Sequence, residues 1–156
     1  MSKHIYREKI GNDEIIIRPF EEKDASVLAK LLNESEEGWP GGFTGGIPYT
    51  EERVLEEIKR EKPLICFILT FNRKVIGICS VSEHWIEKDV AYVSFLNLHP
   101  KYHGRGLGRR LLMQGVKFAI DKGFKRLDLH TWPGNMKAVP LYKKTGFFWM
   151  PGTHVY

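Results

Sequence analysis

The sequence predicts an α/β (α+β) fold, in which helices flank a mixed β-sheet. Three observations carry this prediction: the chain has 156 residues, 42% of them are hydrophobic, and stretches with helical spacing of apolar residues alternate with short β-branched runs. That length is natural for one domain with its own core, so residues 1–156 are predicted to form a single domain. No internal repeat or low-complexity tract divides the chain.

The first half of the chain is predicted to contain a strand, two helices and a long loop. The strand covers Ile15 to Ile17 and ends before Pro19, which cannot donate to a continuing ladder. The next helix has apolar residues at helical spacing, namely Ala25, Leu28, Ala29 and Leu32. Residues 35–49 hold five glycines and two prolines and are predicted to be a loop, after which Thr50 caps a second helix.

A β-hairpin is predicted from two apolar runs, Leu64 to Phe71 and Lys74 to Ser82. Asn72-Arg73 is the expected two-residue turn, and this register makes Cys66 and Cys79 direct cross-strand neighbours. We expect both to be free thiols. The cysteines follow neither CxxC nor Cys/His spacing, so no metal site is predicted.

The second half of the chain alternates strands and helices. A strand is predicted at Ala91–Leu98, a helix from Gly108 to Lys122, and a strand over Arg126–Thr131. Asn135 is predicted to cap a last helix that runs to Thr145 and precedes a short strand from Phe147. Pro140 removes a helical hydrogen bond, so this helix should start late or kink.

Charge is distributed unevenly along the chain. Residues 1–62 hold ten Lys and Arg against fourteen Asp and Glu, whereas residues 63–156 hold fourteen against five. A basic half suits a polyanionic partner such as a nucleotide cofactor, although solvated surface charge explains the count as well. The sequence shows neither a signal peptide nor an apolar run long enough to cross a bilayer, so we expect a cytoplasmic protein without a membrane partner.

A glycine-rich stretch lies between a predicted strand and a predicted amphipathic helix. Gly104, Gly106 and Gly108 allow successive N–H groups to point at one anion where the helix dipole adds positive charge. Three arginines add formal charge around it, namely Arg105, Arg109 and Arg110. The stretch matches neither the P-loop nor the Gly-x-Gly-x-x-Gly motif. A diphosphate site and a simple tight turn both fit the glycines alone.

Two segments resemble the GNAT superfamily of N-acetyltransferases. The stretch from His103 to Gly108 resembles the Arg/Gln-x-x-Gly-x-Gly/Ala signature for acetyl-CoA, with histidine at the first position, and the stretch from Asn135 to Phe147 resembles the Asn-x-x-Ala-x-x-Leu-Tyr-x-x-x-Gly-Phe element. The resemblance implies a mixed, mostly antiparallel sheet and transfer of acetyl from acetyl-CoA to an amine by direct attack. It implies that the acetyl-CoA contacts come from Leu96, Leu98, His103, Gly104, Arg105, Gly106, Leu107, Gly108, Arg109, Asn135 and Tyr142.

The resemblance also suggests catalytic roles. Strands 91–98 and 126–131 should splay apart around the pantetheine arm, and Tyr142 should protonate the departing thiolate. His130 holds a position where some relatives carry glutamate, and it is the candidate base. The alternatives are a core tyrosine and a packing or surface histidine, with Glu83, His84 and Asp128 as further candidate bases.

Other functions and partners stay open. A non-catalytic acyl-CoA-binding regulatory module would keep the loop without turnover. A nucleic-acid partner is disfavoured, because the basic residues are not interleaved with stacking aromatics. The resemblance implies that the acceptor binds at the loop over residues 35–49. A cationic or stacking amine is favoured by the aromatic and acidic residues of this loop, namely Trp39, Phe43, Tyr49, Glu36 and Glu37. A homodimer is compatible with the sequence.

Overall fold

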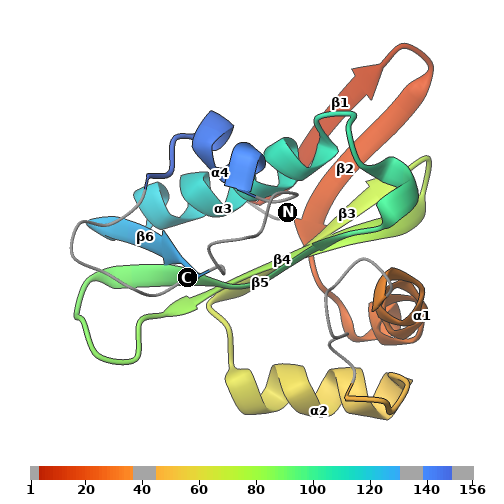
Figure 1. Cartoon of the computed structure of the whole chain (residues 1–156), viewed down its shortest axis with the longest axis horizontal. Coiled ribbons are helices and arrows are strands. Elements are labelled where there is room, and N and C mark those ends of the chain that lie inside the picture. The colour runs from red at the N-terminus through yellow and green to blue at the C-terminus, as the bar shows by residue number, and fades with distance from the viewer. Residues whose placement is uncertain (1–3, 37–44, 131–138, 149–156) are drawn as a thin grey trace.

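The computed structural model describes residues 4–36, 45–130 and 139–148, which form a six-stranded sheet with helices on both faces (Figure 1). The strands lie side by side in chain order: β1 (Tyr6–Ile10), β2 (Asp13–Pro19), β3 (Ile65–Phe71), β4 (Lys74–Glu83), β5 (Val90–Leu98) and β6 (Arg126–Leu129). Each neighbouring pair is antiparallel except β5 and β6, which pair parallel. The predicted α/β (α+β) class with a mixed, mostly antiparallel sheet is confirmed.

Two helices lie on each side of the sheet in Figure 1, with α1 (Ala25–Ser35) and α2 (Glu51–Glu61) opposite α3 (Leu107–Asp121) and α4 (Val139–Thr145). The α3-side core consists of Ile15, Ile17, Phe67, Leu69, Ile76, Cys79, Val81, Ala91, Val93, Leu107, Leu111, Leu112 and Phe118. The α1-side core consists of Ala25, Leu28, Ala29, Leu31, Leu32, Val54, Cys66, Ile68, Val75 and Ile78. The central strands are therefore apolar on both faces, which explains their continuous apolar runs.

Strand β1 is not predicted from the sequence. It pairs antiparallel with β2 along its whole length and forms one edge of the sheet. Its central residues Arg7, Glu8 and Lys9 are charged, and only Tyr6 packs against the α3-side core. An edge strand with so little buried apolar surface carries no hydrophobic alternation that would mark it.

The hairpin of β3 and β4 turns at Asn72-Arg73, as predicted. Both residues have positive φ angles, 49° and 70°, which are the angles that a type I′ turn requires. Beyond the turn, however, the register shifts by one residue between Leu69 and Thr70. Such a β-bulge places one extra residue in one strand and bends it.

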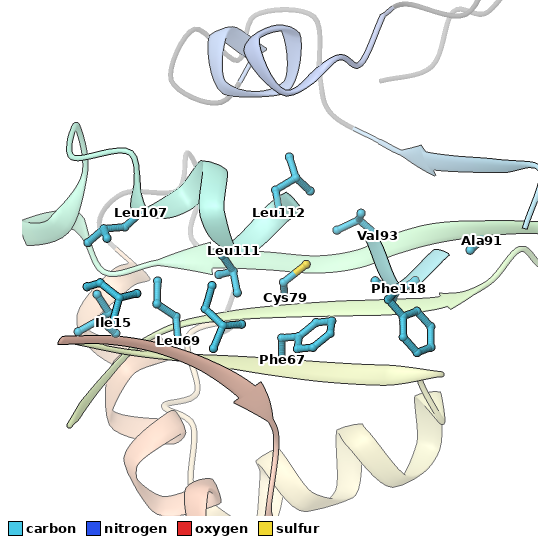
Figure 2. Packing of buried hydrophobic residues seen from close by; sticks show 13 residues of the cluster. Ile15, Phe67, Leu69, Cys79, Ala91, Val93, Leu107, Leu111, Leu112 and Phe118 are labelled. Carbon is cyan, nitrogen blue, oxygen red and sulfur yellow. The ribbon is translucent and has the colours of Figure 1, made fainter. Parts of the chain in front are cut away.

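The predicted pairing of Cys66 with Cys79 is wrong because of this shift. Cys79 faces Phe67, and Cys66 faces Ser80. A slip of one residue moves side chains to the other face of the sheet, so Cys79 packs in the α3-side core (Figure 2) and Cys66 in the α1-side core. Both thiols are free, and burial raises the pKa of Cys66 to about 11.

The predicted start of α2 agrees with the structure, and α3 begins and ends one residue earlier than predicted. The Thr50 side chain accepts a hydrogen bond from the backbone N–H of Arg53 at 3.1 Å, which confirms it as the cap of α2. Pro140 is the second residue of α4, where a missing N–H costs nothing. Thr131 and Asn135 lie outside the described residues, as does most of the strand expected from Phe147. No helix in the described part of the chain is long and apolar enough to span a membrane.

Candidate active site

The glycine-rich loop connects β5 to α3 through the short 3₁₀ turn η3 (Pro100–Tyr102). Gly104 and Gly106 have φ angles of 80° and 76°, in the left-handed region that residues with a Cβ rarely adopt. Gly106 immediately precedes the first residue of α3, Leu107. The first backbone N–H groups of a helix have no partner within it, so the loop presents donors at the positive end of a helix dipole. This arrangement can bind an anion.

Gly108 has a different role from the two loop glycines. It lies inside α3, and a Cβ built on it would come within 3.3 Å of the Leu141 side chain in α4 and 3.8 Å of Leu98 in β5. The absence of a side chain therefore lets α4 and β5 approach α3 closely. Gly108 shapes the site by packing, and its backbone belongs to the first turn of the helix.

The charged residues around the loop are not equivalent. The guanidinium of Arg105 lies 5.3 Å from the ring centre of Tyr102 and 5.8 Å from that of Phe71, and Arg109 is exposed. The Nε2 atom of His103 donates a hydrogen bond to the carbonyl oxygen of Leu98 at 2.8 Å. Histidine at this position thus ties the loop to the end of β5, which is a role that the sequence does not reveal.

Strands β5 and β6 pair only along part of β5. The parallel ladder ends where Val93 faces Leu129, whereas β5 continues to Leu98. At the same point Ser94 is an extra residue in the pairing of β5 with β4, and its hydroxyl lies 2.9 Å from that of Ser82. The edge of β5 that contains Leu96 is therefore unpaired by any described strand, and this is where the pantetheine arm is expected.

Tyr142 lies on α4, on the same side of the sheet as α3. It is half-buried against the α3-side core, and burial, together with nearby Cys79, raises its pKa. The phenol therefore carries its proton at neutral pH and is able to donate it. No described residue forms a hydrogen bond with its hydroxyl, which weakens the alternative of a core tyrosine bonded to backbone.

His130 lies on the other side of the sheet. His130 directly follows the end of β6. Tyr92 lies between Ala91 and Val93 of the α3-side core, so Tyr92 faces the opposite side of the sheet. There its ring contacts that of Trp85, with centroids 5.2 Å apart. The exposed imidazole of His130 contacts the ring of Trp85, with centroids 5.4 Å apart. The structure thus places the two candidate catalytic side chains on opposite faces of the sheet.

Two of the three alternative bases are engaged in other bonds. The Asp128 carboxylate accepts two hydrogen bonds from Arg126, at 2.6 and 2.9 Å. The Nδ1 atom of His84 accepts the backbone N–H groups of Ile86 and Glu87 at 3.1 and 2.9 Å. Glu83 is exposed at the end of β4. Among these four candidates, only His130 and Glu83 are exposed and form no hydrogen bond with a described residue.

The structure describes only part of the loop over residues 35–49, where the acceptor is expected. Trp39, Phe43 and Glu37 lie outside the described residues. Tyr49 donates a hydrogen bond to Glu57 at 2.9 Å, and the Arg53 guanidinium lies 4.0 Å from its ring centre. Burial, followed by Glu57, raises the pKa of Tyr49 to about 12. This tyrosine is therefore bound to α2.

Sequence reasoning missed Trp85 and Glu8. Trp85 is 60% exposed in the β4–β5 turn, where it stacks on His84 at 4.0 Å and contacts His130. Glu8 forms an ion pair with Arg110, next to the glycine-rich loop. An aromatic residue in a turn and a glutamate in a charged segment carry no local signal, because only the fold brings them to the site.

Comparisons with known proteins identify similar sequences and folds. A profile of the acetyltransferase (GNAT) family matches residues 28–147. A putative [ribosomal protein bS18]-alanine N-acetyltransferase of Bacillus subtilis is 27% identical over 64% of this chain and 64% of its own length. A thialysine N-epsilon-acetyltransferase of Sus scrofa is 25% identical over 85% of this chain and 83% of its own length.

A solved structure of the same family has a similar fold. An acetyltransferase of the GNAT family from Streptococcus pneumoniae has a TM-score of 0.73 and 26% identity, and the match covers 87% of this chain and 85% of that one. The alignment with the Bacillus relative spans less than two thirds of that protein. The family match and the N-acetyltransferase names of the relatives support the predicted class of activity, with acetyl-CoA as the co-substrate.

Proposed function

We propose, since the chain belongs to the acetyltransferase (GNAT) family, that it transfers an acetyl group from acetyl-CoA directly to a primary amine within a ternary complex. One observation carries the proposal: the unpaired edge of β5 leads through the glycine-rich loop to the start of α3, with a phenol on one side of the sheet and an imidazole on the other. The contacts expected of Leu96, Leu98, Asn135 and the loop residues 103–109 are part of this proposal.

The reaction needs a neutral amine and a proton for the departing sulfur. His130, acting through water, takes one proton from the ammonium group of the acceptor. The amine nitrogen then attacks the thioester carbonyl, a C–N bond forms and the C–S bond breaks. Tyr142 gives its proton to the CoA thiolate and regains one from the nitrogen through water. The products are the amide, CoA with a free thiol, and one proton.

The acceptor is proposed to be a primary amine on a small molecule or a protein. The relatives described above are named for an alanine of a ribosomal protein and for the ε-amine of thialysine. These two names share an amine and differ in its carrier. We place the enzyme in the cytoplasm and treat residues 1–156 as one domain. A homodimer would be tested by light scattering.

The experiment for this function is turnover of the purified protein with acetyl-CoA and a panel of amines. Release of CoA should depend on the amine, and mass spectrometry should find the acetylated product. The panel includes peptides, lysine analogues and polyamines. If the protein binds acetyl-CoA but none of these amines causes release of CoA, the regulatory module is favoured instead.

A change of His130 to glutamine should lower turnover in a pH-dependent way. The variant lacks the base, so kcat/KM for the amine should fall by about 10²-fold near neutral pH. The defect should shrink as pH rises, because the amine then loses its proton without help. Exposed Ile86→Ala in the neighbouring turn is the control. A pH–rate profile equal to that of the parent protein would end the role of His130 as base.

A further inference from the structure

Glu8 of β1 is joined to Arg110 of α3 across a long stretch of sequence. The Nε atom of Arg110 donates to Oε1 of Glu8 at 2.7 Å, and its Nη2 atom donates to Oε2 at 3.2 Å. A bidentate pair of this kind fixes the plane of the guanidinium as well as its position. The edge strand β1 is therefore bonded to the helix that begins at the glycine-rich loop.

The same guanidinium also contacts the loop. Its Nη1 atom donates to the carbonyl oxygen of Gly106 at 3.1 Å, and the backbone N–H of Arg110 reaches that oxygen at 3.3 Å. In a trans peptide unit the C=O and the following N–H point in opposite directions. Holding the Gly106 carbonyl toward Arg110 therefore turns the N–H of Leu107 away from Arg110, toward the open side of the loop.

Tyr6 completes the contact. Its hydroxyl donates to Oε1 of Glu8, and its ring packs against the α3-side core. The hydrogen bonds from Arg110 and then from Tyr6 lower the pKa of Glu8 to about 2. A lowered pKa means that the contact is complete above the ordinary carboxyl range and is lost only as the pH falls toward 2. Glu8 is thus ionised at neutral pH.

We propose that Glu8 and Arg110 are positioning residues that hold the Gly106 turn in the shape that binds the diphosphate of acetyl-CoA. This inference rests on the proposed function, because it assumes that the loop binds that diphosphate. It gives the N-terminal strand a part in cofactor binding. It also assigns different roles to the three arginines. The Arg110 guanidinium is hydrogen-bonded to Glu8, whereas Arg105 and Arg109 remain available to phosphate oxygens.

Simple electrostatics predicts a change in CoA affinity of the opposite sign. Removing a negative charge near a binding site for a polyanion should strengthen binding if Glu8 acts only through its field. Loss of a positioning contact should weaken binding, although the local charge becomes more positive. The direction of the change in CoA affinity for Glu8→Gln therefore distinguishes the two explanations.

The experiment titrates the full chain with CoA by calorimetry and measures turnover with acetyl-CoA and with S-acetyl-pantetheine, which lacks the diphosphate. We expect Glu8→Gln to weaken CoA binding about three- to tenfold, the range of one lost hydrogen bond. KM for S-acetyl-pantetheine should not change. Glu22→Gln, which removes the same charge from an exposed site, is the matched control. Unchanged or tighter CoA binding by Glu8→Gln would overturn the proposal.

A double-mutant cycle tests whether Glu8 acts through Arg110. In an Arg110→Gln background, Glu8→Gln should cause no further loss of CoA affinity, whereas full additivity would contradict the proposal. If Glu8→Gln does not fold, Tyr6→Phe provides a milder perturbation of the same contact and should weaken CoA binding in the same direction. A parent protein that fails to bind CoA would refute the proposed function itself, which keeps the two failures distinguishable.

Discussion

Tyr142→Phe should lower kcat by about 10²- to 10⁴-fold, the usual contribution of general acid–base catalysis, while acetyl-CoA affinity changes little. The substitution keeps the ring that packs against the α3-side core and removes only the proton donor. Because no described residue bonds to the hydroxyl, stability should also be retained. kcat, CoA affinity and thermal unfolding are measured on the same variant.

Thr145→Val is the control for Tyr142→Phe. It removes another hydroxyl from α4, one that donates to the carbonyl of Leu141 at 2.8 Å. This variant should lose some stability and keep its kcat. If Tyr142→Phe were stable with the kcat of the parent protein, the phenol would not be the acid. A loss of stability with unchanged chemistry would identify it as a packing residue.

Gly106→Val should abolish most binding of acetyl-CoA in a protein that still folds. The φ angle of 76° is unfavourable for valine, and a Cβ at this position would lie 2.9 Å from Nη1 of Arg110. The turn must move, and each hydrogen bond to a phosphate that is lost should cost about ten- to a hundredfold in affinity. Calorimetric titration with CoA measures the loss.

Gly123→Val is the matched control for the loop variant. Gly123 has a φ of 82° and follows the C-cap of α3, at the end of the helix that lies away from the loop. A Cβ at Gly123 meets no atom within 4 Å. It carries the same backbone strain without touching the cofactor site, so it should lose stability and keep CoA affinity. Equal affinities for both variants and the parent protein would remove the loop from the cofactor site.

Much of the fold could be predicted from local patterns. Helical spacing identified α1 and α3, Thr50 identified the start of α2, and turn chemistry located the β3–β4 hairpin at Asn72-Arg73. These features depend on residues that are close in sequence. The register of that hairpin could not be predicted, because both faces of its strands are buried and hydrophobicity does not indicate which side faces which helix pair.

The candidate site shows the same division. The turn of the loop can be predicted from its glycines, because residues with a Cβ rarely adopt this backbone geometry. The ion pair between Arg110 and Glu8 could not be predicted from the sequence. The two residues meet only because β1 pairs at the sheet edge and α3 packs over the sheet. Sequence alone treats all three loop arginines alike.

The sequence by itself determined the class of fold, the glycine-rich loop and the family, because periodicity, turn residues and motif spacing are local properties of the chain. Only the tertiary structure decided that the Tyr142 phenol and the His130 imidazole lie on opposite faces of the sheet, and which arginine is engaged by the protein. The physical reason is that strand pairing, bulges and helix packing bring together residues that are far apart in sequence. No local pattern in the chain indicates these contacts.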